Sequence, residues 1–381
     1  MTRHRVTFSV VVVLACAAIG GRALDAQQQN QAPSAAAIRV LPIRGNLFMI
    51  EGDGGNVTVS VGQDGVLMVD TGLSQNADRL LATIQQLQQE MAVREEWYEK
   101  RVATPTAAAA RSTVADRHVP PPLKPIRYII NTHVHPDHVG GNAVFRQHGQ
   151  TFTGGNVAND IKDAREGAAI LAHENVLNRM SEPPQGEQPA PAEALPTDTY
   201  YRDSLKLSHF FNGEGVQLIH LPKAHTDGDS IVWFRGTDVI ATGDIYVTES
   251  YPVIDVARGG TINGIVDALN RIIDMSFAEF RTEGGTLIIP GHGRISDIAD
   301  VTYYRDMTVI LRDRIQDAIK KGMTLDQVKA ANLTIDYEPR YGSKTGFWTT
   351  DKFLEAAYTS LGGGKAQTTT ARRGAQGRTQ E

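Results

Sequence analysis

Residues 131–142 restrict the possible folds and functions of this chain more than any other segment. They follow a short apolar run and read Asn-Thr-His-Val-His-Pro-Asp-His-Val-Gly-Gly-Asn. Three histidines and one aspartate within six positions are a dense set of donors, and imidazole with carboxylate suits zinc, iron or manganese. If the segment is extended, His133, His135 and Asp137 point the same way and His138 points elsewhere. Because one metal cannot easily take both groups, the spacing predicts two adjacent metals and a catalytic site.

Residues 1–26 predict a secretory signal peptide. Two arginines precede an apolar run at 6–20, and small residues follow up to Ala26, as in a positive n-region, an h-region and a cleavage site. The apolar run is too short for a comfortable transmembrane span. Cys16, which ends Val-Leu-Ala-Cys, leaves open a lipoprotein signal in which this cysteine carries a lipid anchor. Either version predicts a periplasmic or secreted protein.

Composition places the chain among globular proteins and excludes some kinds of site. Its 381 residues are 41% hydrophobic and 21% charged, which allows a sizeable core. Cys16 is the single cysteine, so the processed chain can form no disulfide and offer no thiolate to a metal. The net charge of −5 and the absence of a basic face argue against nucleic acid as a partner. We expect a small-molecule substrate, and the oligomeric state stays open.

Strand patterns followed by helical patterns occur twice along the chain. In the first half, strands are predicted at 47–50, 57–61, 66–69 and 127–131, and helices at 76–100 and around 173–180. In the second half, strands are predicted at 216–221, 230–234, 239–242 and 286–289, and helices at 262–275, 298–321, 325–332 and 352–361. Two such halves predict an α/β protein in which two mixed β-sheets pack face to face with helices outside, a four-layer αββα sandwich.

The remaining segments complete the predicted organisation. After the signal peptide we expect a flexible N-terminal segment at 27–37, a catalytic domain at 38–361 and a disordered tail at 362–381, which has almost no apolar content. Two Pro-rich stretches, at about 103–125 and 182–196, are interpreted as loops inserted into the domain.

Three more donors occur downstream, each at a junction between a predicted strand and a loop. His225 follows the strand at 216–221, Asp244 stands in Thr-Gly-Asp, and His292 stands in Pro-Gly-His-Gly. Functional groups usually occupy such loops because a rigid sheet holds them in place. We therefore expect these three residues to join the metal site.

Taken in order, these segments resemble the metallo-β-lactamase-fold hydrolase superfamily. The resemblance covers about residues 40–294 and includes Val-Asp70-Thr-Gly upstream of the histidine-rich segment. It implies two zinc ions, with iron or manganese as alternatives, that share a hydroxide as the nucleophile. It assigns His133, His135 and His225 to the first metal, Asp137, His138 and His292 to the second, and Asp244 to both. It also implies that Asp137 orients the hydroxide as the catalytic carboxylate and that Asp70 orients a ligand loop.

Asp244 narrows the prediction within that superfamily. Its β-lactamases carry a cysteine or serine at this place, whereas an aspartate is similar to the glyoxalase II, lactonase and related esterase branches. Export argues against glyoxalase II, which is usually intracellular. We therefore predict an exported dinuclear hydrolase of an ester, lactone, thioester or amide. A periplasmic β-lactamase, an iron-dependent redox enzyme and a non-catalytic binding module remain alternatives, and the sequence does not identify the substrate.

Four further residues have both a functional and a structural interpretation. Tyr246 could donate a hydrogen bond to a developing oxyanion, although a tyrosine there more often packs. His173 could face the site, but a structural role fits its context better. Asp227 and Asp229, beside His225, could support the site or could simply form a turn with the glycine between them.

Overall fold

The computed structural model describes residues 37–52, 54–102, 122–151, 167–278 and 284–363. The signal peptide, Cys16, nearly all of 27–37, most of the loop at 103–125 and all but the start of the tail at 362–381 lie outside these ranges, so those assignments stay predictions. Within the described ranges, no helix combines the length and the apolar character that a membrane span requires.

The first sheet contains seven strands that lie side by side in sequence order. They are β1 (Arg39–Arg44), β2 (Leu47–Glu51), β3 (Val57–Gly62), β4 (Gly65–Val69), β5 (Ile126–Ile130), β6 (Ala169–His173) and β7 (Asp198–Tyr200). The pairs from β1 to β4 are antiparallel and those from β4 to β7 are parallel. The sheet is therefore mixed, as predicted, and its central strands are buried on both faces.

The second sheet contains five strands in the order β12-β11-β10-β9-β8. They are β8 (Ser204–Lys206), β9 (Val216–His220), β10 (Ser230–Phe234), β11 (Val239–Ala241) and β12 (Leu287–Ile289). All neighbours are antiparallel except β11 and β12. Because β10 runs against both β9 and β11, the strands β9, β11 and β12 all end at the same edge of the sheet.

The two sheets pack against each other through alternate residues of their strands. Met49 of β2 and Val69 of β4 meet Leu218 of β9 and Val232 of β10 in one buried cluster. The neighbouring residues point to the opposite faces because side chains alternate along a strand. Each sheet therefore has a second apolar face that helices must cover.

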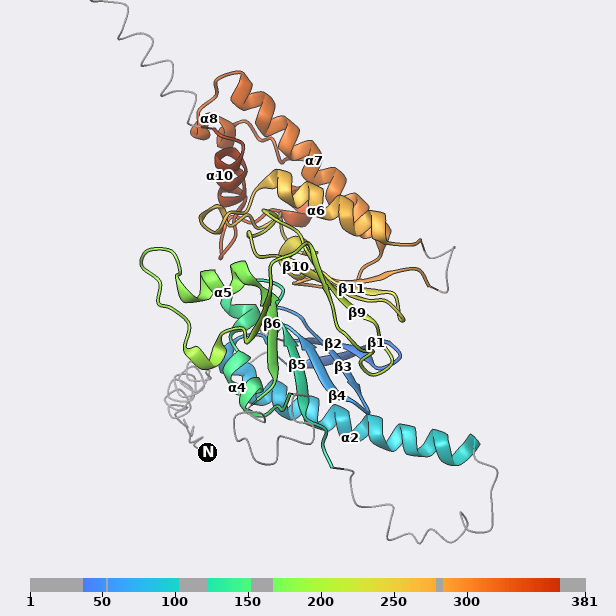
Figure 1. The fold of residues 1–381 in the computed structure, drawn as a ribbon. Coiled ribbons are helices and arrows are strands. Elements are labelled where there is room, and N and C mark those ends of the chain that lie inside the picture. Colours follow the sequence, from blue (N-terminus) through green and yellow to red (C-terminus); the bar gives the residue numbers. More distant parts are fainter. Residues whose placement is uncertain (1–36, 53, 103–121, 152–166, 279–283, 364–381) are drawn as a thin grey trace, which may run out of the picture. The chain divides into compact units, whose positions relative to one another are not determined.

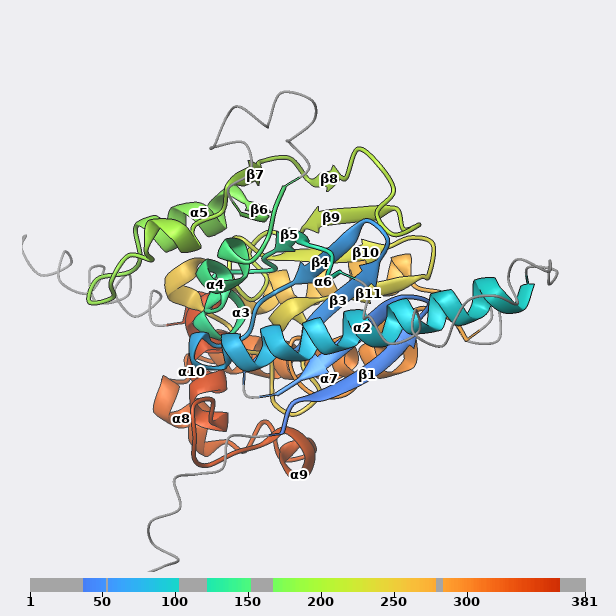
Figure 2. The ribbon, with the colours of Figure 1, turned by 90° about the horizontal axis from the view of Figure 1, so that it is seen from below.

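Helices cover both of these outer faces (Figures 1 and 2). On the first sheet, α2 (Ala77–Val102) and α4 (Asn142–Gln147) bury Leu80, Ile84 and Phe145 against the strands. On the second sheet lie α6 (Ile262–Met275) and α7 (Ile298–Lys320), while α10 (Thr350–Ser360) packs against α7 and α8 (Leu325–Ala330). The shorter helices are α3 (Pro136–Val139), α5 (Glu174–Ser181) and α9 (Glu338–Tyr341). The predicted αββα architecture is confirmed.

Four strands were not predicted from the sequence: β1, β6, β7 and β8. β7 and β8 have only three residues each, too few to show a period, and β1 contains a proline and is half exposed. β6 is fully buried and ends at His173, where α5 begins. The His173 ring accepts a hydrogen bond from the backbone N–H of Asn175 at 3.3 Å, which caps α5. The helical pattern around 173–180 therefore hid the end of a strand.

Phe145 tests the contact between α4 and the first sheet. Its side chain is completely buried, so Phe145→Ala should lower the free energy of unfolding by about 3–5 kcal/mol because it leaves a cavity. Phe210→Ala is the control, since that side chain is 74% exposed and should change stability by less than about 0.5 kcal/mol. Urea denaturation followed by circular dichroism measures both, and equal effects would show that α4 does not pack as described.

Candidate metal centre

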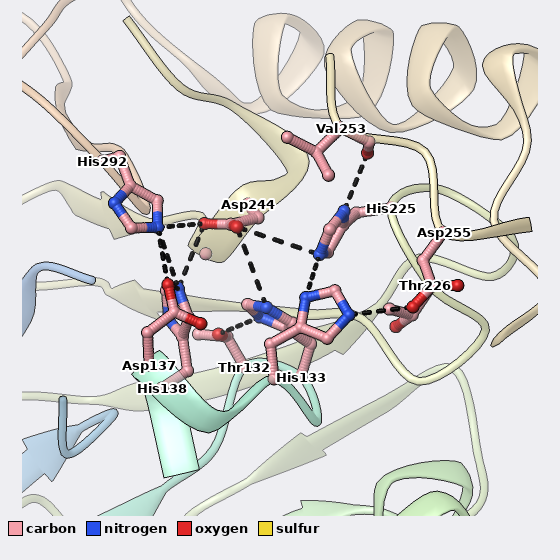
Figure 3. Close-up of polar contacts among 12 residues, drawn as sticks. Thr132, His133, Asp137, His138, His225, Thr226, Asp244, Val253, Asp255 and His292 are labelled. Carbon is pink, nitrogen blue, oxygen red and sulfur yellow. Dashed lines mark hydrogen bonds and ion pairs between the residues drawn. The ribbon is translucent and has the colours of Figure 1, made fainter. Parts of the chain in front are cut away.

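All seven predicted ligands lie on loops or short helices after the ends of four strands. His133 and His135 follow β5, Asp137 and His138 belong to α3, His225 follows β9, Asp244 lies in the 3-10 helix η6 (Gly243–Ile245) after β11, and His292 follows β12. Because the two sheets pack face to face, these loops meet at one edge of the sandwich (Figure 3).

A first group consists of His133, His135, His225 and Asp244. One donor atom from each residue lies within 4.8 Å of the others. His225 Nε2 is 2.8 Å from His135 Nδ1. Asp244 Oδ2 lies 3.9 Å from His133 Nε2 and 3.8 Å from His225 Nε2. The group therefore brings three imidazole nitrogens and one carboxylate oxygen around a single point.

A second group consists of Asp137, His138 and His292. His292 Nε2 lies 3.1 Å from Asp137 Oδ2 and 3.4 Å from His138 Nε2. The other oxygen of Asp244, Oδ1, is 3.2 Å from His138 Nε2 and 3.5 Å from His292 Nε2. The Asp244 carboxylate therefore lies between the groups and turns one oxygen toward each (Figure 3).

Asp137 does not belong to the group predicted for it. An extended segment would point Asp137 with His133 and His135, but a helix begins at Pro136. Proline is suited to the first helical position because its φ is already helical. The turn redirects Asp137 toward His138 and His292. The two groups match those that the family resemblance implied.

The hydrogen-bond partners determine which nitrogen of each histidine faces the centre. Thr132 Oγ1 donates its single proton to Asp70 Oδ2 at 2.7 Å. Toward His133 Nδ1, which is 3.0 Å away, the hydroxyl can therefore act only as an acceptor, and the histidine nitrogen donates. His225 Nδ1 donates to the backbone oxygen of Val253 at 2.8 Å. The protons of both rings therefore lie on the outside, and each Nε2 offers a lone pair to the centre.

Asp70 supports the second group, as expected for a residue that orients a ligand loop. Its Oδ2 accepts from His138 Nδ1 at 2.8 Å, and its Oδ1 accepts from the backbone N–H of Thr132 at 2.8 Å. Asp70 has a φ of 62°, which is uncommon for a residue other than glycine. One buried carboxylate thus fixes both the histidine ring and the loop after β5.

Asp255 is a functional residue that the sequence analysis missed. Its Oδ2 accepts from His135 Nε2 at 2.9 Å, which leaves His135 Nδ1 to face His225. Arg258 Nη1 donates to the same Asp255 oxygen at 2.8 Å. No local sequence pattern connects Asp255 with His135, which lie 120 positions apart.

Burial and neighbouring charges set the ionisation of the site. Burial, together with nearby histidines, lowers the pKa of His225 to about 4 and that of His133 well below its usual range. Burial also opposes the charged form of His138, but Asp244 and Asp70 outweigh it and raise its pKa well above the ordinary value. Burial alone would raise the pKa of Asp244, but the neighbouring His138 and His292 outweigh burial and lower this pKa to well below its ordinary value. Asp244 is therefore an anion near neutral pH.

Two glycines allow the backbone to approach the ligands. A Cβ atom at position 291 would lie 2.0 Å from Asp244 Oδ1, and one at position 55 would lie 2.4 Å from Cε1 of His138. Neither distance is possible for real atoms, so both positions need glycine.

The structure places Tyr246 in the packing role, the more common of the two interpretations of this residue. Its hydroxyl donates to Ser296 Oγ at 3.0 Å, and its buried ring packs against Tyr304 with centroids 5.2 Å apart. The hydroxyl is therefore engaged within the core beneath α7. The contacts of Tyr246 with Ser296 and Tyr304 account for a tyrosine at this position without any catalytic role.

The other uncertain residues also have structural explanations. His173 stacks on His220, with ring centroids 3.6 Å apart. Asp229 accepts two hydrogen bonds from Thr226, and Asp227 forms an ion pair with Arg179 at 2.7 Å. Asp229 thus holds the turn that carries His225, whereas Asp227 ties that turn to α5.

The donor atoms fit a divalent metal. His133 Nε2 is buried without a hydrogen-bond partner among the described residues, a costly arrangement unless a cation accepts its lone pair. His225 Nε2 and His135 Nδ1 face each other while both rings donate outward. A set of imidazole and carboxylate donors without thiolates suits zinc, iron or manganese.

Comparisons with known proteins agree with this fold and site. The model of the metallo-beta-lactamase superfamily matches residues 50–292, more than half of the chain. A linear primary-alkylsulfatase from Pseudomonas sp. (strain ATCC 19151) is 23% identical over 233 residues, which cover 54% of this chain and 42% of the relative. The chain thus spans less than half of that relative's length.

One of the solved structures that superpose on this chain supports the same fold. The stereoselective inverting sec-alkylsulfatase Pisa1 from Pseudomonas sp. superposes with a TM-score of 0.53 at 16% identity, over 84% of this chain and 50% of that one. The metallo-beta-lactamase DIM-1 superposes with a TM-score of 0.43 at 16% identity, over 72% of this chain and 99% of that one. From the match over residues 50–292, the chain belongs to the metallo-beta-lactamase superfamily.

Proposed function

We propose that this chain is an exported hydrolase that holds two divalent cations, by preference zinc, and cleaves an ester, lactone, thioester or amide bond. The position of Asp244 supports this proposal most directly. Its Oδ2 faces His133 and His225, and its Oδ1 faces His138 and His292. A carboxylate so placed offsets the repulsion between two neighbouring cations.

The chain's own residues would share the work as follows. His133, His135 and His225 would hold one cation, Asp137, His138 and His292 the other, and Asp244 both. When bound, two such cations lower the pKa of water and polarise the bond to be cleaved. Asp137 lines the cavity beside the cluster and stays partly exposed, so it can orient a water molecule there and take its proton.

Asp137 has the ionisation state that this role requires. Burial opposes its charge, but the hydrogen bond from His292 and the charge of His138 outweigh burial and lower its pKa below the usual value. It is therefore a carboxylate near neutral pH and can accept a proton.

Zinc and export are supported by the sequence and by the donor types. The processed chain has no cysteine, and a site of imidazoles and carboxylates suits zinc while also admitting iron or manganese. Export to the periplasm or beyond is inferred from the signal-like pattern of residues 1–26.

Sulfate esters are a second candidate substrate class. The linear primary-alkylsulfatase and the sec-alkylsulfatase, both from Pseudomonas sp., resemble this chain in sequence and in fold respectively. Hydrolysis of p-nitrophenyl acetate and p-nitrophenyl sulfate separates the two classes because the leaving group is the same. We expect the acetate to be the better substrate, and a preference for the sulfate would favour the second candidate.

Removal of the metal should abolish hydrolysis. We expect two equivalents of a divalent metal by elemental analysis of the purified protein, loss of turnover after chelation, and recovery when zinc is added.

Asp244→Asn keeps the shape of the side chain but halves its capacity as a ligand, so turnover should fall at least about a hundredfold. A variant with two metals and unchanged turnover would contradict the proposed role of Asp244.

Asp255 should strengthen metal binding through His135. Asp255→Asn weakens the acceptor that orients this ring, and loss of such a partner typically lowers metal affinity about 10- to 100-fold. Asp336→Asn is the matched control, because Asp336 also pairs with an arginine but contacts no proposed ligand. Competition with a chromogenic chelator measures the metal affinity of each variant. Equal metal affinities in the two variants would show that Asp255 does not contribute to metal binding.

Gly291→Ala should disturb the site without unfolding the protein. The added Cβ would lie 2.0 Å from Asp244 Oδ1 and 2.6 Å from the backbone carbon of Gly243, so the turn that carries Asp244 must shift and metal content should fall below two equivalents. Gly52→Ala is the control, since its Cβ would lie an ordinary 3.5 Å from Cγ1 of Ile38. Elemental analysis measures the metal content, and circular dichroism shows whether the protein is still folded. Full metal content in Gly291→Ala would refute the proposed crowding.

A further inference from the structure

We propose that the cavity beside the metal centre binds an uncharged, apolar part of the substrate, such as a medium-length acyl or alkyl chain, and disfavours a carboxylate on that part. The inference rests on the proposed function for the bond that is cleaved. It adds the chemical class of the group next to that bond.

The cavity is continuous with the proposed metal site and has the size of a small-molecule site. Its volume is about 930 Å³, and its walls include His135, Asp137, Asp244 and His292. Cavities of a few hundred to about a thousand Å³ hold ligands of drug size. A group bound here would therefore adjoin the reacting bond.

Most of the remaining wall is apolar. It is formed by Leu73, by Pro136, by the loop after Asp244 and by the segment before α10. The apolar residues at the cavity are Leu73, Pro136, Val247, Val253, Ile254, Val256, Phe347 and Trp348. An apolar chain that covers such a wall gains about three- to fourfold in affinity for each buried methylene. The lining thus favours aliphatic or aromatic groups.

Phe347 is the most accessible apolar side chain of this wall. It is 78% exposed, yet its segment is anchored: Lys352 Nζ donates to the Phe347 backbone oxygen at 2.6 Å and lies 5.5 Å from the ring centroid. The neighbouring Trp348 packs against the core beneath the second sheet. A ligand could therefore cover the Phe347 ring without moving its backbone.

The charges of the cavity argue against a carboxylate on the bound group. Among the described residues that line it, Arg258 is the single lysine or arginine. Its Nη1 donates to Asp255 Oδ2 at 2.8 Å, and its Nη2 binds Glu187, so its charge is already neutralised. Glu249 is exposed at the same wall. An anionic group would lose its hydration and meet like charges.

Equilibrium binding tests this inference without any turnover. The neutral fluorophore N-phenyl-1-naphthylamine is bound to the purified protein and displaced by octan-1-ol, butan-1-ol or 8-hydroxyoctanoate. We expect octan-1-ol to compete at concentrations at least about tenfold lower than the other two. Failure of the fluorophore to bind, or equal competition by all three, would overturn the inference.

Chelator-treated protein separates the cavity from the metals. A carboxylate can gain affinity from a bound cation, so the same displacement is repeated after chelation. Octan-1-ol should again compete at concentrations at least about tenfold lower than 8-hydroxyoctanoate, and equal competition or a preference for 8-hydroxyoctanoate in the chelated protein would overturn the inference.

Two variants locate the effect, each with a matched control. Phe347→Ser should weaken octan-1-ol binding about tenfold, whereas Phe210→Ser removes an equally exposed ring outside this cavity and should not.

Glu249→Lys should improve 8-hydroxyoctanoate binding about three- to fivefold, whereas Glu193→Lys makes the same charge change away from the cavity. Equal effects in variant and control would contradict the assignment.

Kinetics separate failure of this inference from failure of the proposed function. We compare p-nitrophenyl esters of acetic acid, octanoic acid and octanedioic acid, the last as its monoester. The octanoate should give the highest kcat/KM, and nitrocefin, which carries a carboxylate, should be a poor substrate. No turnover of any ester together with selective octan-1-ol binding would reject the proposed function alone. Equal turnover of all three esters would reject the inference alone.

Discussion

The buried carboxylate of Asp244 is the constraint on which the rest of the site depends. It is an anion with histidines on both sides, and it stands on a 3-10 turn after β11 where Gly291 leaves room for it. The histidines of the first half of the chain can reach it only if the two sheets pack face to face. The apolar cluster between the sheets therefore stabilises the fold and at the same time brings the two halves of the site together.

Sequence reasoning could predict whatever depends on local pattern. The longer strands show an alternation of apolar and polar residues. His133, His135 and His225 can be recognised as candidate ligands because they are histidines that follow apolar runs. It failed where one turn of backbone decides direction, as for Asp137, whose helix begins at Pro136. It also failed where contacts join distant positions: nothing near Asp255 in the sequence indicates its bond to a histidine 120 residues away. Short strands such as β7 and β8 carry too little pattern to be recognised.

Asp255 and Arg258 connect the proposed metal site to the wall of the cavity. Asp255 holds His135, Arg258 holds Asp255, and Arg258 also binds Glu187. Glu187 lies in the stretch at 182–196, which the sequence described only as an inserted loop. The same arginine thus contacts both the carboxylate that accepts from His135 and a residue of the inserted loop. These ion pairs account for Asp255, Arg258 and Glu187 within an otherwise apolar wall.

Two independent features now argue against a β-lactam as the natural substrate. Asp244 stands where the β-lactamases of the superfamily carry a cysteine or serine, which changes the donors of the proposed second metal. Among the described residues that line the cavity, the single lysine or arginine is Arg258, and it already pairs with Asp255 and Glu187. The first feature concerns the bond that is cleaved and the second the group beside it. Since they lie in different segments of the chain, their agreement favours a neutral ester-like substrate more strongly than either feature alone.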